Sequence, residues 1–412
     1  MARNLEVNGE RLWRSLMEMA RIGATPRGGV CRVALTDLDR EGRDLFVAWC
    51  REAGMDVRVD PMGNIFARRP GRNPELPPVG TGSHLDSQPT GGKFDGVYGV
   101  LAGLEVMRTL DDHGIETEAP LEVVVWTNEE GARFAPAMMG SGVYAGVFEL
   151  DVVHAARDRE GVSVGQALGD IGYRGEPLDD HRFGAFFEAH IEQGPVLESA
   201  GKTIGVVTDV QGMRWFDVDF MGDEAHAGPT PMNMRRDALA GAVELAPLVY
   251  ALADERAPHG RATVAEFVSE PASRNTVPGH ARFSVDMRHP QVLELDAMDE
   301  GMRSAAARIA AARDLVCEVS KVWDSAPVAF DPRCVDAVRR GAELMGYPAM
   351  NAVSGAGHDS VYVSRLAPTA MVFIPCKDGI SHNETESATP EHVTAGTNVL
   401  LHAMLELAGA PR

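Results

Sequence analysis

The stretch "PVGTGSHLDSQPTGGKFDGVYGVLAGLEV", residues 78–106, runs from an apolar strand through a glycine-rich turn into a helix. Residues 78–84 have the length of a buried strand, and 97–112 repeat apolar side chains at helical spacing. His84, Asp86 and Asp95 lie between them. Because ligands in α/β sheets gather outside the carboxyl ends of the strands, the stretch predicts a binding site at this turn.

The glycine-rich turn does not have the pattern of a nucleotide-binding loop. It matches neither the G-x-x-x-x-G-K-[ST] nor the G-x-G-x-x-G spacing, and the Asp95 carboxylate would repel a phosphate. The glycines are instead expected to allow a tight turn and a close approach of the backbone. Two interpretations remain, a turn with scattered polar residues and half of a metal site.

Strands and helices alternate on both sides of this stretch. Thr389 and Pro390 have the residue types of a helix cap and a first helical position. The alternation predicts an α/β domain in which helices flank a mixed sheet. The other expected elements of this domain are strands at 121–127 and 368–374, a helical region over 1–60, and a helix at 391–408.

The middle of the chain has a different pattern. Segments 215–222 and 280–289 alternate apolar and polar residues, which is typical of strands with one wet face. A third strand at 263–270 and helices at 236–256 and 293–314 complete the set. We therefore expect a smaller α+β domain at 210–326, inserted into a catalytic domain made of 1–209 and 327–412.

Composition limits the classes of partner. The chain has 412 residues and a formal net charge of −21, which argues against nucleic acid or an anionic membrane as partner. No apolar run approaches the roughly 18 residues that span a bilayer, and the N-terminus lacks a secretory signal. The five cysteines are scattered without a C-x-x-C pair. These features predict a cytoplasmic protein without a disulfide framework.

Three more segments are expected to place a histidine or a carboxylate just after a predicted strand: "NEEGARF" (128–134), "EAHIEQGP" (188–195) and "GISHNETE" (379–386). Their convergence would give nitrogen and oxygen ligands suited to Zn, Mn, Co or Ni rather than a thiolate site. In "NEEG" one glutamate could bind metal while its neighbour acts as general base. The alternative is a charged strand end without chemistry.

Seven motifs in chain order resemble one group of dinuclear-metal amidohydrolases. The group contains N-carbamoyl-L-amino acid hydrolases, β-ureidopropionases and allantoate amidohydrolases, within a wider family of aminoacylases and glutamate carboxypeptidases. The resemblance extends from about residue 5 to 408 and implies a metallopeptidase-like catalytic domain. It also implies a homodimer formed through the inserted dimerisation or lid domain. The motifs are "GSHLDS…GGKFDGVYGVLAGLEV", "WTNEEGARF", "EAHIEQGPVLE", "GDEAHAGPTPMNMRRDAL", "VPGHARFSVDMRHP", "SGAGHDS" and "IPCKDGISHNETE".

The resemblance implies two divalent metal ions per subunit, Zn or alternatively Mn, Co or Ni. Asp95 would bridge both ions. The ligands implied are His84, His190 and Asp95 for one ion, and Glu130, His382 and Asp95 for the other. Independently of the resemblance, Asp86 lies two residues after His84 on the same side of an extended chain, and this spacing predicts that it accepts the second N–H of the His84 imidazole.

The resemblance also implies the catalytic and substrate-binding residues. Glu129 would be the general base, and His226 and His358 would act on the substrate from opposite sides. Arg288 would pair with the substrate carboxylate, because its planar fork matches two oxygens. Asn275 and Gln193 would be polar substrate contacts; alternatively, Asn275 is a turn residue and Gln193 supports the ligand loop.

The predicted activity is removal of the carbamoyl group from N-carbamoyl-L-amino acids, giving the amino acid, CO2 and ammonia. Allantoate, ureidoglycolate and β-ureidopropionate remain alternative substrates, since each combines a ureido group with a carboxylate. An aminoacylase or peptidase is disfavoured, because peptidase relatives carry a carboxylate where this chain has His190. A non-catalytic binding protein is disfavoured because Glu129 is intact.

Overall fold

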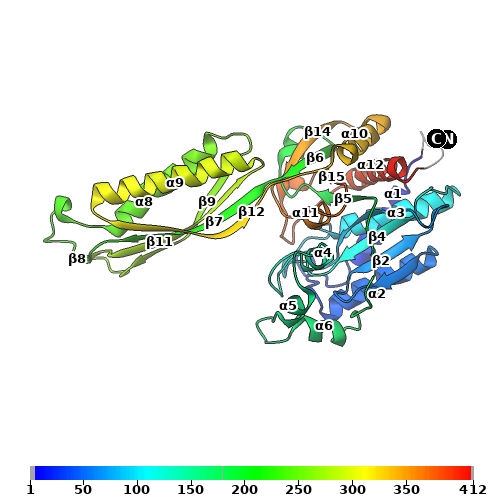
Figure 1. Cartoon of the computed structure of the whole chain (residues 1–412), viewed down its shortest axis with the longest axis horizontal. Helices are drawn as coiled ribbons and strands as arrows, with labels where there is room; N and C mark the ends of the chain where they lie inside the picture. Colours follow the sequence, from blue (N-terminus) through cyan, green and yellow to red (C-terminus); the bar gives the residue numbers. More distant parts are fainter. Residues whose placement is uncertain (1–4, 179, 410–412) are drawn as a thin grey trace. The chain divides into compact units, whose positions relative to one another are not determined.

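The computed structural model describes residues 5–178 and 180–409, and the chain divides into two compact units (Figure 1). The large unit comprises Met1–Thr208 and Phe330–Arg412, and the inserted unit comprises Asp209–Ala329. The sequence-based boundaries at 209/210 and 326/327 fall close to these points. The α/β class with a mixed sheet and flanking helices is confirmed.

A nine-stranded sheet organises the large unit, in the order β1-β2-β4-β3-β5-β15-β6-β13, with β14 paired to β6 off this path. Strands β6 and β13 lie where the chain passes between the units. The strands are β1 (Asp56–Val59), β2 (Ile65–Arg69), β3 (Val79–His84), β4 (Leu121–Trp126), β5 (Ala185–Ile191), β6 (Ile204–Val210), β13 (Val328–Ala329), β14 (Ala349–Ser354) and β15 (Thr369–Ile374).

The centre of this sheet is parallel. Strand β3 pairs in parallel with both β4 and β5, and β15 pairs in parallel with β5. Their carboxyl ends therefore meet at one edge, where the register places His84 opposite Trp126 and His190 opposite Phe373. All residues of these four strands are buried, as expected for parallel strands covered on both faces.

Helices cover this sheet. Helix α3 is almost wholly buried and packs against β3 and α12. Helix α12 begins as predicted, because the Thr389 side chain accepts a hydrogen bond from the His392 N–H and Pro390 occupies the first turn. The helices of the large unit are α1 (Gly9–Met19), α2 (Asp37–Glu52), α3 (Val97–Asp112), α4 (Met139–Tyr144), α5 (Leu150–Ala155), α6 (Val164–Asp170), α7 (Val196–Ser199), α10 (Pro332–Met345), α11 (Asp359–Val363) and α12 (Pro390–Ala408), with the 3-10 turn η3 (Lys377–Gly379).

Two expectations about this unit were wrong in detail. The region 1–60, expected to be helical, ends in the strand β1, because Gly54 adopts a positive φ of 70° after α2 and Asp56–Val59 pair with β2. His190 lies inside a strand rather than after one, since β5 continues to Ile191.

The inserted unit contains a four-stranded antiparallel sheet in the order β12-β7-β11-β9. Apolar residues of alternate positions, such as Phe216 and Phe283, form a core with α8 and α9. The elements are β7 (Gly212–Met221), β8 (Ala225–His226), η2 (Met232–Met234), α8 (Ala238–Asp254), β9 (Arg261–Glu270), β10 (Thr276–Val277), β11 (His280–His289), α9 (Val292–Arg313) and β12 (Val316–Ser325).

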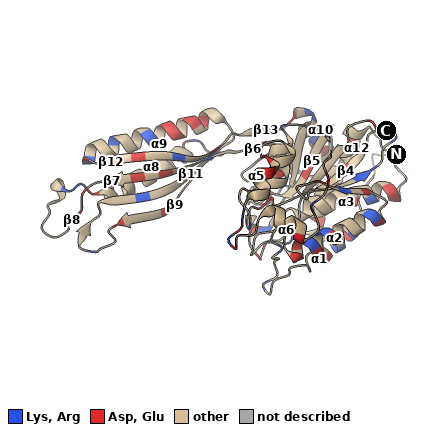
Figure 2. Cartoon of the chain, turned by 60° about the horizontal axis from the view of Figure 1, so that its bottom comes forward, with Lys and Arg blue, Asp and Glu red and all other residues tan. Residues whose placement is uncertain are grey.

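The charges of α9 in the inserted unit are divided along the helix. Its acidic residues lie in the N-terminal half and its basic residues in the C-terminal half (Figure 2), and the two halves meet where Arg303 pairs with Asp299, one helical turn away. In the part of the chain that the structure describes, no helix is long and apolar enough to cross a membrane.

Candidate metal and catalytic site

The candidate site lies at the carboxyl edge of the parallel strands. Each strand or the loop after it contributes one or two side chains, and the turn before α3 contributes another. The contributing positions are His84 at the end of β3, Asp95 before α3, Glu129 and Glu130 after β4, His190 near the end of β5, and His382 in the loop after β15.

Asp95 lies at the centre of this cluster. Its Oδ1 is 3.1 Å from His190 Nε2 and 3.7 Å from His84 Nε2. Its Oδ2 is 3.3 Å from His382 Nε2, which is in turn 3.4 Å from Glu130 Oε2. The two oxygens of one carboxylate therefore face two different sets of ligand atoms. Each residue of a set offers one ligand atom, and these ligand atoms all lie within 4.8 Å of one another.

Backbone carbonyls orient two of the imidazoles. His84 Nδ1 lies 2.9 Å from the Asp86 carbonyl oxygen, and His190 Nδ1 lies 2.9 Å from the Ile191 carbonyl oxygen. Both Nε2 atoms are therefore left facing Asp95. Gly96 permits this arrangement, because its φ is 66° and an added Cβ would lie 2.4 Å from the His84 ring.

The contact expected of Asp86 is corrected by the structure. Its carboxylate is 3.9 Å from His84 Nδ1, so the backbone carbonyl of Asp86 holds the ring instead. The carboxylate accepts the backbone N–H of Glu129 at 3.3 Å and that of Glu130 at 3.2 Å. Asp86 thus fixes the loop that carries both glutamates.

Gln88 is a contact that sequence reasoning missed. Its backbone N–H and its side-chain amide both donate to the Glu130 carboxylate, at 3.1 and 2.8 Å. The residue lies in the same turn as His84 and Asp95. Its position in the sequence, a polar residue between two candidate ligands, is the feature that could have identified it as part of the site.

Three carboxylates around Asp95 resist ionisation, whereas at Asp95 itself burial is outweighed by the hydrogen bonds and charges of the neighbouring histidines, which hold its pKa well below the ordinary value. Burial, followed by the charge of Asp359, raises the pKa of Glu129 well above its ordinary value. Burial and the charge of Asp95 raise the pKa of Glu130 to about 7. Burial also raises the pKa of Asp86 to about 6. Like charges crowd a site that is largely closed to water.

The histidines show the opposite trend. Burial opposes the charged form of His190, but the hydrogen bond to Asp95 and the charges of Asp95 and Glu188 together outweigh it and raise the pKa of His190 to about 9. The hydrogen bond to Asp95 likewise raises the pKa of His382 to about 9. Protons on these rings balance part of the acidic charge.

This donor set fits divalent cations. Imidazole nitrogens and carboxylate oxygens suit Zn, Mn, Co and Ni, and thiolates are not among the ligands of either set. Buried carboxylates of like charge are costly unless cations accompany them. Positive charge at the two sets would neutralise Asp95 from both sides.

His358 and Gln193, predicted to contact the substrate, lie beside the cluster. The His358 ring centroid is 4.6 Å from that of His190, and its Nε2 is 2.9 Å from Ser354 Oγ. Burial and the neighbouring His190 lower the pKa of His358 well below its ordinary value, so the ring is neutral. Gln193 Nε2 donates to Asp95 Oδ2 at 2.9 Å and so contacts a candidate ligand directly.

The other three predicted residues belong to the inserted unit, not to the unit that holds the cluster. His226 is exposed on β8, which pairs with β10, and Asn275 immediately precedes β10. Arg288 lies on β11, where its Nε and Nη2 donate to the carboxylate of Asp286 at 2.7–3.1 Å. Asp286 was not predicted, although it lies two residues away on the same face of the strand.

Glu188 is another residue that the sequence did not single out. Its buried carboxylate accepts from Ser83 Oγ at 2.7 Å and from the Ser360 hydroxyl and N–H at 2.6 and 3.1 Å. It therefore joins the strands that carry His84 and His190 to the start of α11. An acidic residue inside the otherwise apolar strand β5 was the signal.

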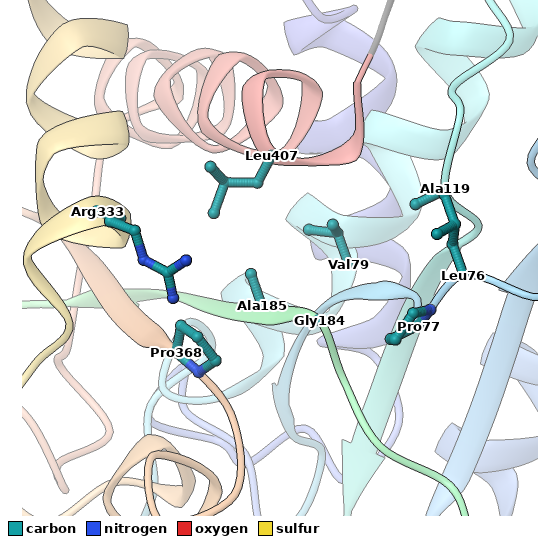
Figure 3. Close-up of a pocket in the computed structure, with 9 residues that line it drawn as sticks. All are labelled: Leu76, Pro77, Val79, Ala119, Gly184, Ala185, Arg333, Pro368 and Leu407. Atoms are coloured by element: carbon teal, nitrogen blue, oxygen red, sulfur yellow. The ribbon is translucent and has the colours of Figure 1, made fainter.

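The opposite ends of the parallel strands have a different character. A hollow of about 230 Å³ is lined by the starts of β3 and β5 and by Pro368, just before β15 (Figure 3). Its walls are apolar apart from Arg333, which pairs with Asp331. The lining has no histidine or carboxylate, so the chemistry gathers at the carboxyl edge.

A metal-dependent hydrolase needs nitrogen and oxygen ligands for its metal and a further carboxylate that can act as general base. The carboxyl edge of this sheet has both. Residues 80–406 match the model of Peptidase family M20/M25/M40. The chain belongs to this metal-dependent family.

Relatives extend over the whole chain. It is 49% identical to an N-carbamoyl-L-amino-acid amidohydrolase of Rhizobium meliloti, over 98% of each chain. It is 33% identical to an allantoate amidohydrolase of Bacillus subtilis, over 95% of each. A crystal structure of an amidase of the hydantoinase/carbamoylase family from Burkholderia multivorans has a TM-score of 0.96 and 59% identity, covering 99% of this chain and 100% of that one.

Proposed function

We propose that the chain hydrolyses N-carbamoyl-L-amino acids. Water would add to the ureido carbon, the bond from that carbon to the amino-acid nitrogen would break, and the released carbamic acid would decompose to CO2 and ammonia. The observation that carries the proposal is the double ligand set around Asp95 beside a glutamate that belongs to neither set, Glu129, whose side chain is 12% exposed. The Rhizobium meliloti relative named for this activity supports the substrate class.

Two divalent cations are the proposed cofactor. One would be held by His84, His190 and Asp95, and the other by Asp95, Glu130 and His382. When bound, such ions polarise a carbonyl and lower the pKa of water.

Glu129 is the proposed general base. Its Oε2 lies 3.4 Å from His84 Nε2, at the margin of the first ligand set. Its raised pKa suits a group that takes a proton near neutral pH and releases it again. The Glu129 carboxylate would take a proton from the attacking water and deliver it to the leaving amine.

Arg288 is the proposed partner of the substrate carboxylate. Asp286 accepts hydrogen bonds from Nε and Nη2 of this guanidinium, which carries five N–H donors in all. A planar fork can bind two carboxylates along two edges. Asn275, Gln193 and the two histidines His226 and His358 are proposed to position the ureido group and its developing negative charge.

Allantoate is the second candidate substrate, favoured by the Bacillus subtilis relative. The deciding experiment strips the metal and reconstitutes separate samples with Zn, Mn, Co or Ni. Each sample is then assayed with N-carbamoyl-methionine, β-ureidopropionate and allantoate. We expect the highest kcat/KM on N-carbamoyl-methionine. A kcat/KM on allantoate well above that on N-carbamoyl-methionine would change the proposed substrate to allantoate. Absence of turnover with every metal would contradict the proposal that the chain is an enzyme.

We also propose a homodimer formed through the inserted unit. Its sheet ends in two edge strands, β9 and β12, and Val243 and Tyr250 on α8 are 56% and 44% exposed. His226 would then serve the partner's site. Light scattering should give twice the 44.3 kDa mass of the chain. A fully active monomer would contradict both the dimer and the role of His226 across subunits.

A further inference from the structure

Glu386 is a buried carboxylate that none of the roles above uses. It is 2% exposed and lies four residues after His382. Its Oε1 accepts the backbone N–H of Phe94 at 3.0 Å and that of Asp95 at 3.1 Å. Its Oε2 accepts from the Ser381 hydroxyl at 2.9 Å. One side chain thus ties together the two loops that carry Asp95 and His382.

Gly92 leaves room for this carboxylate. A Cβ built on Gly92 would lie 2.0 Å from Glu386 Cδ and Oε1, and its three nearest atoms all belong to Glu386. The φ of Gly92 lies outside the left-handed region, so an alanine is allowed there by its own backbone. The absence of a side chain at residue 92 is therefore explained by the space that Glu386 occupies.

We propose that Glu386 is the positioning residue for the bridging carboxylate: it fixes the backbone of Asp95 and the loop of His382 in one orientation, so that Asp95 can face both ligand sets at once. The inference rests on the proposed metal site. Without the Glu386 carboxylate, two buried N–H groups lose their acceptor, and the turn is free to rotate Asp95 away from one set. Groups that orient metal ligands in this way typically change metal affinity by about 10–100-fold.

The test measures Mn²⁺ binding to metal-stripped full-length protein by titration calorimetry. Glu386→Ala should weaken binding by about 10–100-fold. Glu386→Gln should restore most of the affinity, because its amide oxygen can still accept both N–H groups. Glu384→Ala is the matched control, since Glu384 lies in the same loop and faces Arg27 instead. It should bind like the wild type.

A double-mutant cycle makes the assignment specific. Gly92→Ala alone should weaken Mn²⁺ binding, because the new methyl group displaces the Glu386 carboxylate. In the Glu386→Ala background, Gly92→Ala should leave Mn²⁺ affinity almost unchanged, because the carboxylate that the new methyl group would displace is absent. Additive losses in the cycle would show that Gly92 and Glu386 act separately and would overturn the proposal.

Hydrogen exchange of the metal-free protein provides a readout that needs no metal. The amides of Phe94 and Asp95 should be protected in the wild type and exchange faster in Glu386→Ala, while amides in the inserted unit stay unchanged. Wild-type Mn²⁺ affinity or unchanged exchange in Glu386→Ala overturns this inference alone. A wild-type protein that binds none of Mn²⁺, Zn²⁺, Co²⁺ and Ni²⁺ overturns the proposed function and this inference with it.

Discussion

The metal cluster of the large unit and the open face of β11 in the inserted unit handle charge in opposite ways. In the cluster, Asp95, Glu129 and Glu130 crowd together, and two of these three carboxylates have raised pKa values. On β11, in contrast, the ionisable side chains are paired across or along the strands. The pairs are Arg288 with Asp286, Arg282 with Asp217, and His280 with Asp219.

The difference separates two kinds of site. A buried group of like charges is stable only when something from outside completes it, which here would be two cations. A surface of matched pairs is complete by itself, so a substrate anion has to share an arginine that already has a partner. The cluster around Asp95 should therefore change with metal content and pH. The face of β11 should instead be sensitive to replacement of the planar guanidinium of Arg288.

The largest effect is expected from Glu129→Gln. The amide cannot take a proton from water, so kcat should fall by about 10²–10⁴-fold. The change keeps the size of the side chain, and Glu129 belongs to neither ligand set, so metal content measured by mass spectrometry should be unchanged. An unchanged kcat would place the base elsewhere.

Acidification from pH 8 to pH 6 should weaken binding of the ion at the His190 set by about 100-fold. Binding of the ion at the His382 set should weaken by more, because Glu130, with a pKa of about 7, also takes up a proton in this range. A metal ion needs the lone pair of a neutral imidazole, while His190 and His382 each have a pKa of about 9 in the metal-free protein. Affinity is then greatest above pH 9 and falls as the pH falls, because each ion must displace a proton. Calorimetry in buffers of different ionisation enthalpy counts the protons released. A flat affinity over this range would contradict the prediction.

Arg288→Lys should lower kcat/KM by about 30-fold, the lower end of the 2–5 kcal/mol found for losing one partner of a hydrogen-bonded charge pair. Lysine keeps the charge but loses the fork that can hold Asp286 and a substrate carboxylate together. Arg282→Lys, on the same face of β11 and paired with Asp217, is the matched control. The loss should vanish for an N-carbamoyl amino acid amide, which has no carboxylate. An equal loss on that amide would show a structural effect.

Much of the candidate site could be predicted from sequence because its residues sit at the ends of strong local patterns. His84 closes an apolar strand, and Glu129 and Glu130 follow another, so the topology of a parallel sheet brings them together. Strand β5 was harder, since every residue in it is buried and neither a period of two nor one of 3.6 marks it.

Contacts between distant segments could not be predicted in this way. Glu386 holds the backbone of Phe94 across 292 positions, and no local pattern reports such a pairing. The Asp86 carboxylate likewise reaches Glu129 and Glu130 across 43 and 44 positions, whereas spacing alone suggested the nearby ring of His84. Local spacing identifies which residues are available, and the tertiary fold decides which atoms meet.

Asp86→Asn tests that last distinction with the smallest expected effect, a loss of about tenfold in metal affinity. The amide keeps one acceptor but turns an NH2 group toward the other backbone N–H, which disturbs the loop of Glu130. The Asp86 carbonyl that orients His84 is untouched. The loss should therefore affect the ion of the Glu130 set. Titrations of His382→Ala and His84→Ala show which binding step belongs to which ligand set. A loss confined to the His84 set would restore the interpretation based on spacing.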